Sequence, residues 1–248
     1  MPPGLRALWR LVRCVATGLH GLVIVLLVFP SLDAAARQAR IRWWSAKMLR
    51  SIGIDLQVAG APVAGGCLLA VNHVSWLDIM AVHAVVPAAR FVSKADVKAW
   101  PLVSRLVDAA GTLYLEREQK RDALRVVHRM AESLRRGDTV AVFPEGTTTT
   151  GHDLLPFHAN LLQAAIATGV PVQPVSLRYA DASHAVSEAV EFVGNTTMLQ
   201  SLWRTAKGER IVARLVFLPP RPAAGAERRE LARALRADIA SALGLAGA

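Results

Sequence analysis

The sequence predicts an α/β fold in which a largely parallel or mixed sheet is flanked by helices and preceded by an N-terminal, membrane-associated helical segment. Two observations predict the sheet: strand-like runs alternate with helical patterns, and several runs are apolar throughout, as in strands buried on both faces. A mean hydropathy of +0.33 together with a net charge of +10 suits a basic protein held at an anionic membrane surface. We therefore divide the 248 residues into membrane-anchoring helices at 1–50 and one α/β domain at 51–248.

The N-terminal segment carries an uncharged apolar run from Cys14 to Phe29, followed at once by Pro30. As a helix this run would be about 24 Å long, short of a hydrocarbon core of about 30 Å. Arginines lie on both flanks, so both flanks are expected to face the cytoplasm. We expect a helix, a break at Pro30 and a second, amphipathic helix with Trp43 and Trp44 at the headgroup boundary, both dipping into one leaflet. A single membrane span, a buried helix of the main domain and a cleaved signal peptide are the alternatives.

The strands and helices of the main domain follow in order. Runs rich in β-branched and apolar residues predict strands at 67–72, 90–93, 112–116, 139–143, 172–179, 189–193 and 210–218. Apolar residues at helical spacing predict a helix over 121–136, and an arginine-rich stretch predicts a last helix over 226–243. The two cysteines, Cys14 and Cys67, lie in apolar runs, so we expect neither a disulfide nor a cysteine-based metal site.

A histidine at the end of the first predicted strand is a candidate catalytic base. His73 follows the apolar run 67–71 and would emerge in a loop at the strand end. Histidine side chains have an ordinary pKa of about 6.5, so they can take a hydroxyl proton at neutral pH, with a carboxylate fixing the tautomer. Asp78 can supply that carboxylate if His73 precedes a helix and Asp78 lies in its first turn, with Ser75 as the cap. A surface histidine near an acidic helix start gives the same pattern.

Two further stretches place polar groups at strand ends. In the loop 143–147, Pro144 and Gly146 predict a tight turn that leaves Glu145 free to accept from substrate hydroxyls, while backbone N–H groups face an anion. An ordinary strand-ending turn is the alternative. Arg117 follows the third predicted strand, where its guanidinium could bind a phosphate through two hydrogen bonds, although a surface arginine gives the same pattern.

A resemblance to a known family rests on four stretches in a fixed order: 71–78, 111–117, 143–147 and 170–175. Together they resemble the glycerolipid acyltransferase family, and within it the lysophosphatidic acid acyltransferase group that includes bacterial PlsC proteins. The resemblance extends from about residue 68 to residue 218. It implies that His73 is the general base and that Asp78 orients it. The residues that it implies for binding the acceptor headgroup are Lys94, Arg117, Glu145, Gly146 and Thr147.

The resemblance also implies a reaction. The enzyme would be an O-acyltransferase without metal or cofactor, in which the activated acceptor hydroxyl attacks a fatty acyl thioester of coenzyme A or of acyl carrier protein. It would act at the cytoplasmic face of the inner membrane, with the lipid bilayer and a lysophospholipid acceptor as partners. We expect lysophosphatidic acid as the acceptor and phosphatidic acid as the product. Four arginines of the last helix are expected either to dock an acyl carrier protein or to form a solvated face: Arg228, Arg229, Arg233 and Arg236.

Two departures from the family pattern leave other functions open. Thr148 stands where many members have an arginine, and residues 157–160 read Phe-His-Ala-Asn where the family often has Phe-x-x-Gly. Threonine-rich loops of this kind also look like the branch that acylates lyso-ornithine lipid, so that lipid or another lysolipid is the alternative acceptor. A non-catalytic basic protein at a membrane surface is an alternative from another class. Signatures of nucleic-acid-binding modules are missing from the sequence, so no nucleic acid partner is expected.

Overall fold

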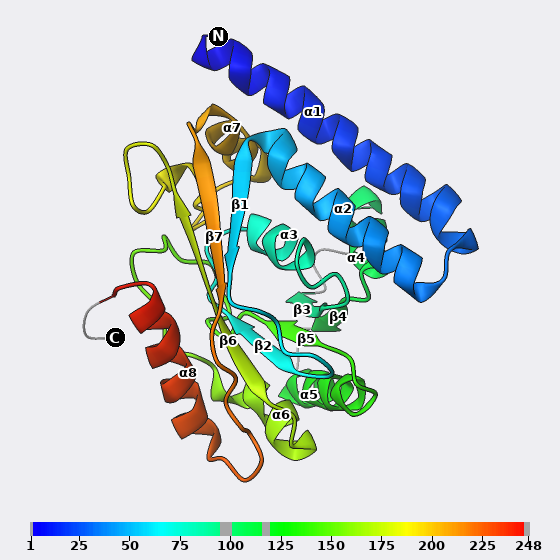
Figure 1. Cartoon of the computed structure of the whole chain (residues 1–248), viewed down its shortest axis with the longest axis vertical. Coiled ribbons are helices and arrows are strands. Elements are labelled where there is room, and N and C mark those ends of the chain that lie inside the picture. The colour runs from blue at the N-terminus through cyan, green and yellow to red at the C-terminus, as the bar shows by residue number, and fades with distance from the viewer. Residues whose placement is uncertain (1, 95–100, 116–119, 246–248) are drawn as a thin grey trace.

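The computed structural model describes residues 2–94, 101–115 and 120–245. Within these ranges, strands form a seven-stranded sheet in the order β1-β7-β6-β2-β5-β3-β4 (Figure 1). Their bounds are β1 Ile54–Ala59, β2 Leu68–Val71, β3 Arg90–Lys94, β4 Leu113–Leu115, β5 Val140–Val142, β6 Val172–Ala180 and β7 Ile211–Phe217. The β6–β7 pair is antiparallel, and the other pairs are parallel. The predicted α/β class, with a mixed sheet, is confirmed.

Helices cover both faces of the sheet. Their bounds are α1 Pro3–Val23, α2 Ala34–Ile52, α3 Leu77–His83, α4 Pro101–Ala109, α5 Lys120–Arg135, α6 Gln163–Thr168, α7 Met198–Lys207 and α8 Arg228–Ala242. In β2, Leu69 and Val71 belong to the hydrophobic core that α2 and α3 share, whereas Leu68 and Ala70 belong to the core that α5 and α8 share. All four side chains are fully buried, which explains why this strand is apolar throughout.

The two N-terminal helices form a hairpin that packs on the domain. After α1 the chain passes through a π-helical turn and a 3₁₀ turn that contains Pro30, and α2 begins where the Asp33 side chain accepts a hydrogen bond from Ala36 N at 2.8 Å. The predicted break at Pro30 and the second helix are confirmed. Gly21 lets the two helices approach closely, because a side chain there would overlap the Trp44 indole, whose Nε1 donates to Thr17 O at 2.8 Å. In Figure 1, α1 lies outside α2, which separates it from the sheet.

Two predictions about strands are wrong. Residues 189–193 do not join the sheet; Glu188–Val190 form a 3₁₀ turn, and Phe192 N donates instead to Val74 O at 3.2 Å. Strand β1, at Ile54–Ala59, was not predicted. It is an edge strand paired only with β7 among the described strands, and most of its side chains are exposed, so its sequence lacks the apolar run of a buried strand.

Candidate active site

The candidate catalytic loop consists of residues 72–76, between β2 and α3. It is held to the sheet where β2 ends. Asn72 follows β2, and its side chain donates to Leu177 O at 2.9 Å and accepts from Leu177 N at 2.7 Å. These two bonds take the place of a further pair of backbone bonds to β6, so the chain leaves the sheet at a fixed point. His73 comes next, at the carboxyl end of a strand that has parallel neighbours on both sides. Open α/β sheets bind their ligands at this edge.

His73 and Asp78 form a buried hydrogen-bonded pair. His73 Nδ1 lies 2.8 Å from Asp78 Oδ2, and the Asp78 side chain is completely buried. The same oxygen accepts from Val74 N at 2.7 Å and from Ser75 N at 3.0 Å. Asp78 lies in the first turn of α3 and His73 lies before it, as the spacing predicted. The predicted cap is wrong: the Asp78 carboxylate satisfies the backbone N–H groups at the helix start, and the buried Ser75 hydroxyl has no hydrogen-bond partner within the described part of the chain.

The position of the carboxylate determines what the imidazole can do. A hydrogen bond from Nδ1–H to Asp78 assigns the neutral tautomer with Nε2 unprotonated. The ring of Phe143 stacks on the His73 ring, with centroids 3.8 Å apart and planes inclined by 7°. The His73 side chain remains 18% exposed. His73 is thus oriented from two sides, and Nε2 is the nitrogen that can accept a proton from a bound hydroxyl.

Glu145 joins the catalytic loop to a second loop. It is 3% exposed; Oε1 accepts from His73 N at 2.7 Å and Oε2 accepts from Leu155 N at 3.0 Å. Burial raises the pKa of Glu145 to about 7, although both backbone donors act in the opposite direction. The sequence suggested a carboxylate that is free to bind substrate. In the structure, both of its oxygens accept backbone hydrogen bonds, and the side chain holds two loops together. Contact of Glu145 with substrate stays a prediction.

The residues after Glu145 turn sharply and then return to His73. Gly146 has a φ of 72°, and a Cβ at this position would lie 2.9 Å from the His158 ring, so glycine suits the turn for both reasons. Gly146 and Thr147 are exposed, where a ligand can reach them. The Thr148 hydroxyl donates to Phe192 O, and Thr149 N donates to His73 O at 2.8 Å. The threonines of this loop thus hold neighbouring segments in place.

Two of the predicted binding residues have side chains outside the part of the chain that the structure describes. Lys94 is the last residue of β3, at the same edge of the sheet as His73, and its side chain is not described. Arg117 itself lies outside the described residues. Their roles in binding a headgroup stay predictions.

Tyr179 is a residue of the site that sequence reasoning missed. Its hydroxyl donates to Asp78 Oδ1 at 2.8 Å, and the residue is 1% exposed on β6. Burial and the neighbouring carboxylate raise the pKa of Tyr179 well above its ordinary value, so it remains a donor. A buried tyrosine hydroxyl needs a partner, and a tyrosine at the end of the predicted strand 172–179 was the available signal. The sequence could not show that the partner is Asp78.

Comparisons with known proteins match this chain to acyltransferases. A family model described as Acyltransferase matches residues 55–178. The chain is 39% identical to a protein of Pseudomonas aeruginosa named lyso-ornithine lipid O-acyltransferase, over 84% of this chain and 79% of that protein. It is 36% identical to a Neisseria meningitidis protein named 1-acyl-sn-glycerol-3-phosphate acyltransferase, over 73% of this chain and 71% of that protein. The crystal structure of PlsC, the 1-acyl-sn-glycerophosphate acyltransferase of Thermotoga maritima, has a similar fold, with a TM-score of 0.70 at 21% identity over 95% of this chain and 96% of that chain.

Proposed function

Because this chain belongs to the acyltransferase family, we propose that it moves a fatty acyl group from an acyl thioester to the free hydroxyl of lysophosphatidic acid, giving phosphatidic acid. The observation that carries the proposal is the 2.8 Å contact between His73 Nδ1 and the buried Asp78 carboxylate. A histidine oriented in this way is a general base, and the exposed turn at Gly146 and Thr147 lies next in the chain to Glu145, which binds the His73 backbone.

The reaction balances without a covalent enzyme intermediate. The acceptor hydroxyl gives its proton to Nε2 of His73 while its oxygen attacks the thioester carbonyl carbon. When the tetrahedral intermediate collapses, the C–S bond breaks, the new C–O ester bond remains, and the proton passes from the imidazolium to the departing thiolate. The Asp78 carboxylate stabilises the imidazolium in between. Neither a metal ion nor an organic cofactor takes part in these steps.

Lysophosphatidic acid is the first candidate acceptor because its phosphate monoester carries close to two negative charges, which Lys94 and Arg117 can neutralise as the family resemblance implies. Lyso-ornithine lipid is the second candidate. The relative named for that acceptor is 39% identical over 84% of this chain, and Thr148 stands where many family members have an arginine.

A direct assay separates the two acceptors. The purified protein is mixed with an acyl thioester and either lysolipid, and the diacyl product is measured by mass spectrometry. We expect a higher kcat/KM with lysophosphatidic acid, an at least tenfold loss of it in Arg117→Ala, and no product from His73→Ala. A higher kcat/KM with lyso-ornithine lipid would mean that this lipid is the acceptor. The proposal of acyl transfer would still stand. Normal turnover by a folded His73→Ala protein would reject the mechanism.

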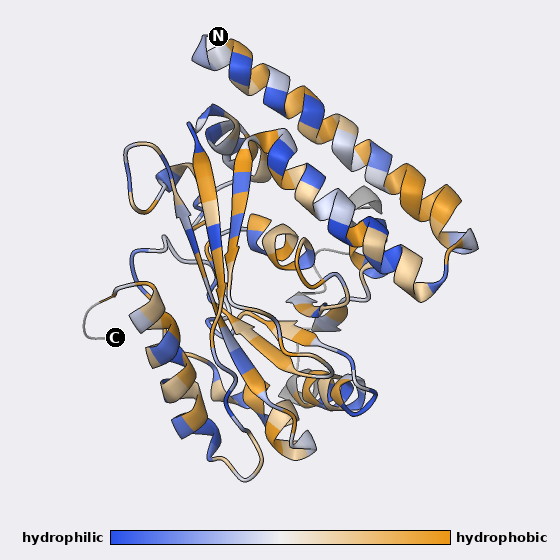
Figure 2. Ribbon diagram, viewed as in Figure 1, coloured by the Kyte–Doolittle hydropathy of each residue, from blue (hydrophilic) through white to orange (hydrophobic). Residues whose placement is uncertain are grey.

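The outer face of α1 supports association with a membrane. Large apolar side chains repeat along this face and the π-helical turn that follows it, and they are between 48% and 74% exposed: Leu5, Leu8, Trp9, Val12, Val15, Leu19, Val23, Leu26 and Leu27. The helical stretch Pro3–Ser31 is long and apolar enough to cross a membrane, and Figure 2 shows α1 mostly hydrophobic toward its junction with α2. Soluble monomers rarely expose so continuous an apolar surface.

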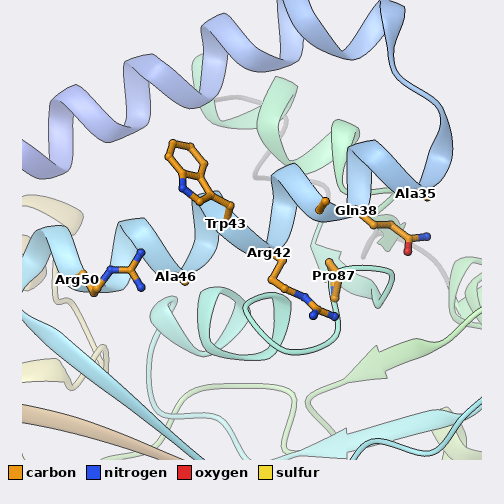
Figure 3. A pocket seen from close by; sticks show the side chains of 8 residues that line it. Ala35, Gln38, Arg42, Trp43, Ala46, Arg50 and Pro87 are labelled. Atoms are coloured by element: carbon orange, nitrogen blue, oxygen red, sulfur yellow. The ribbon is translucent and has the colours of Figure 1, made fainter.

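The basic side chains of α2 support an orientation along the membrane surface. The helix carries five cations and no acidic residue between its first and last residues. Two of them, Arg42 and Arg50, line a hollow of about 520 Å³ together with Trp43 and Pro87, and Arg42 points toward Pro87 (Figure 3). Guanidinium groups beside an interfacial tryptophan suit a layer of anionic headgroups. We propose that the hairpin lies in the cytoplasmic leaflet of the inner membrane without crossing it.

A further inference from the structure

We propose that a groove between α8 and the segment 156–159 is the docking site for an acyl carrier protein, the small acidic protein that would present the thioester donor. The inference rests on the proposed function and names the partner that brings the acyl group to the site. It draws on three features of the groove: its shape, its charge and its connection to His73.

The groove has an apolar wall and a cationic wall. The segment 156–159 contributes Pro156, Phe157 and Ala159, and α8 contributes Ala232 and a row of arginines, around a volume of about 560 Å³. An apolar surface rimmed by charge fits a partner helix that presents a few apolar side chains between acidic ones. The groove runs along the surface of α8, as a docking helix would require.

The arginines of the cationic wall lie on one face of α8. Arg229, Arg233 and Arg236 are spaced by four and three residues, so they follow one another along the helix. Arg229 and Arg233 are exposed. Arg236 is instead engaged within the protein. Its guanidinium donates to Leu154 O at 2.6 Å and to Leu155 O at 3.2 Å, and it lies 4.0 Å from Asp153. Among the residues that the structure describes, none that lines the groove is acidic, so its two exposed arginines present positive charge to a partner.

A short chain of contacts connects the groove to the catalytic base. Arg236 binds the carbonyl groups of the Leu154–Leu155 pair, Leu155 N donates to Glu145 Oε2 at 3.0 Å, and Glu145 Oε1 accepts from His73 N at 2.7 Å. The groove wall begins at the residue after Leu155. A carrier seated there would thus lie close enough to the catalytic loop for its flexible prosthetic arm to deliver the thioester to His73.

The position of α8 also suits a partner that arrives from the aqueous phase. The core of α8 is shared with α5 on one face of the sheet, whereas α2 packs on the other face. In Figure 1, α8 lies at the end of the molecule away from α1. The lysolipid could therefore enter from the membrane while the donor docks from solution, and neither would block the other.

The test compares two donors with the same acyl chain, one on acyl carrier protein and one on coenzyme A. In Arg229→Glu/Arg233→Glu, we expect KM for the carrier thioester to rise at least tenfold, with a weaker dependence on salt, while kcat/KM for acyl-CoA stays within twofold of wild type. Arg129→Glu/Arg135→Glu is the matched control, because it makes the same charge change at exposed positions on α5.

Three outcomes would overturn the docking site. One is an unchanged KM for the carrier thioester, and another is an equal rise in the α5 control. The third is an equal loss with both donors, which would assign the arginines to the phosphates of the donor rather than to a carrier protein. Turnover of acyl-CoA by the wild-type protein tests the proposed acyl transfer independently of the docking site. If docking fails but this turnover is present, only the docking site is rejected. Circular dichroism of each variant confirms that the reversed charges have not unfolded the protein.

Discussion

The hydroxyl of Tyr179 and the ring of His73 bind opposite oxygens of the Asp78 carboxylate, at 2.8 Å each. Two backbone N–H groups, of Val74 and Ser75, complete the set of donors around this completely buried side chain. A carboxylate with four donors cannot rotate without losing hydrogen bonds, and each lost bond would leave a buried polar group unpaired. Asp78 therefore fixes the orientation of His73 and the start of α3 at the same time.

Asp78→Asn is expected to lower kcat by about 10²- to 10⁴-fold with little change in KM, because an amide can no longer accept from all four donors and the orienting charge is lost. Initial rates over a range of lysolipid concentrations measure both constants. Asp181→Asn is the control, because Asp181 Oδ1 lies 3.0 Å from Nδ1 of His184 in a second histidine–aspartate pair, whose histidine is exposed. Equal losses in the two variants would show that the effect does not belong to the His73 pair.

Tyr179→Phe is expected to lower kcat by about three- to thirtyfold, since it removes one donor from Asp78 and leaves the ring in place. A carboxylate with fewer donors attracts the imidazolium more strongly, so the fall of kcat/KM on the acidic side should move to higher pH. The measurement is the full pH profile of kcat/KM. Thr205→Val is the control, because it also deletes one buried hydroxyl, which donates to Ala189 O at 3.0 Å. A lower rate with an unmoved profile would mean a structural role only.

Glu145→Gln should change how stability depends on pH. Burial raises the pKa of Glu145 from 4.5 to about 7 in the folded protein, so folding favours the protonated form, and this group's contribution to stability falls as pH rises through that window. The glutamine cannot ionise but loses an acceptor, at a cost of about 1–3 kcal/mol at every pH. As the pH rises from 5 to 8, the free energy of unfolding of Glu145→Gln should increase relative to that of wild type by on the order of 1–3 kcal/mol.

Denaturant unfolding at several pH values measures this difference. Exposed Glu132→Gln on α5 serves as the control, since its side chain lies on the surface. If wild type and Glu145→Gln keep a constant difference from pH 5 to pH 8, then the Glu145 carboxylate does not titrate in this range.

The sequence predicted those parts of the fold and site that depend on neighbours in the chain. The spacing of His73 and Asp78 sufficed for their pairing, because both lie around one helix start. The contact of Tyr179 with Asp78 spans 101 positions and depends on β6 lying beside β2, which no local pattern encodes. The same holds for the bond between Glu145 and the His73 backbone, which spans 72 positions. Strand β1 was missed for a different reason. Most of its side chains are exposed, so its sequence lacks the apolar pattern by which buried strands are predicted.

The last prediction concerns the side of the membrane on which the N-terminal hairpin lies. Single cysteines placed at Pro3 and Ala34, the first residues of α1 and α2, report on the two ends of the apolar stretch. The native cysteines, Cys14 and Cys67, are buried and can be replaced by alanine to remove their background. If the hairpin lies in one leaflet, a membrane-impermeant thiol reagent should label both positions in inside-out vesicles and neither in right-side-out vesicles.

A span would give the opposite pattern for one of the two positions. If α1 and its continuation to Ser31 crossed the bilayer, Pro3→Cys and Ala34→Cys would be labelled from different sides. The structure favours one side because Arg10 of α1 is held against the end of α7: its guanidinium donates to Ala206 O at 3.1 Å and to Gly208 O at 2.6 Å. A helix crossing the membrane would have to give up these contacts. Labelling of Pro3→Cys only in right-side-out vesicles would therefore reject the one-leaflet arrangement, together with the packing of α1 on α7.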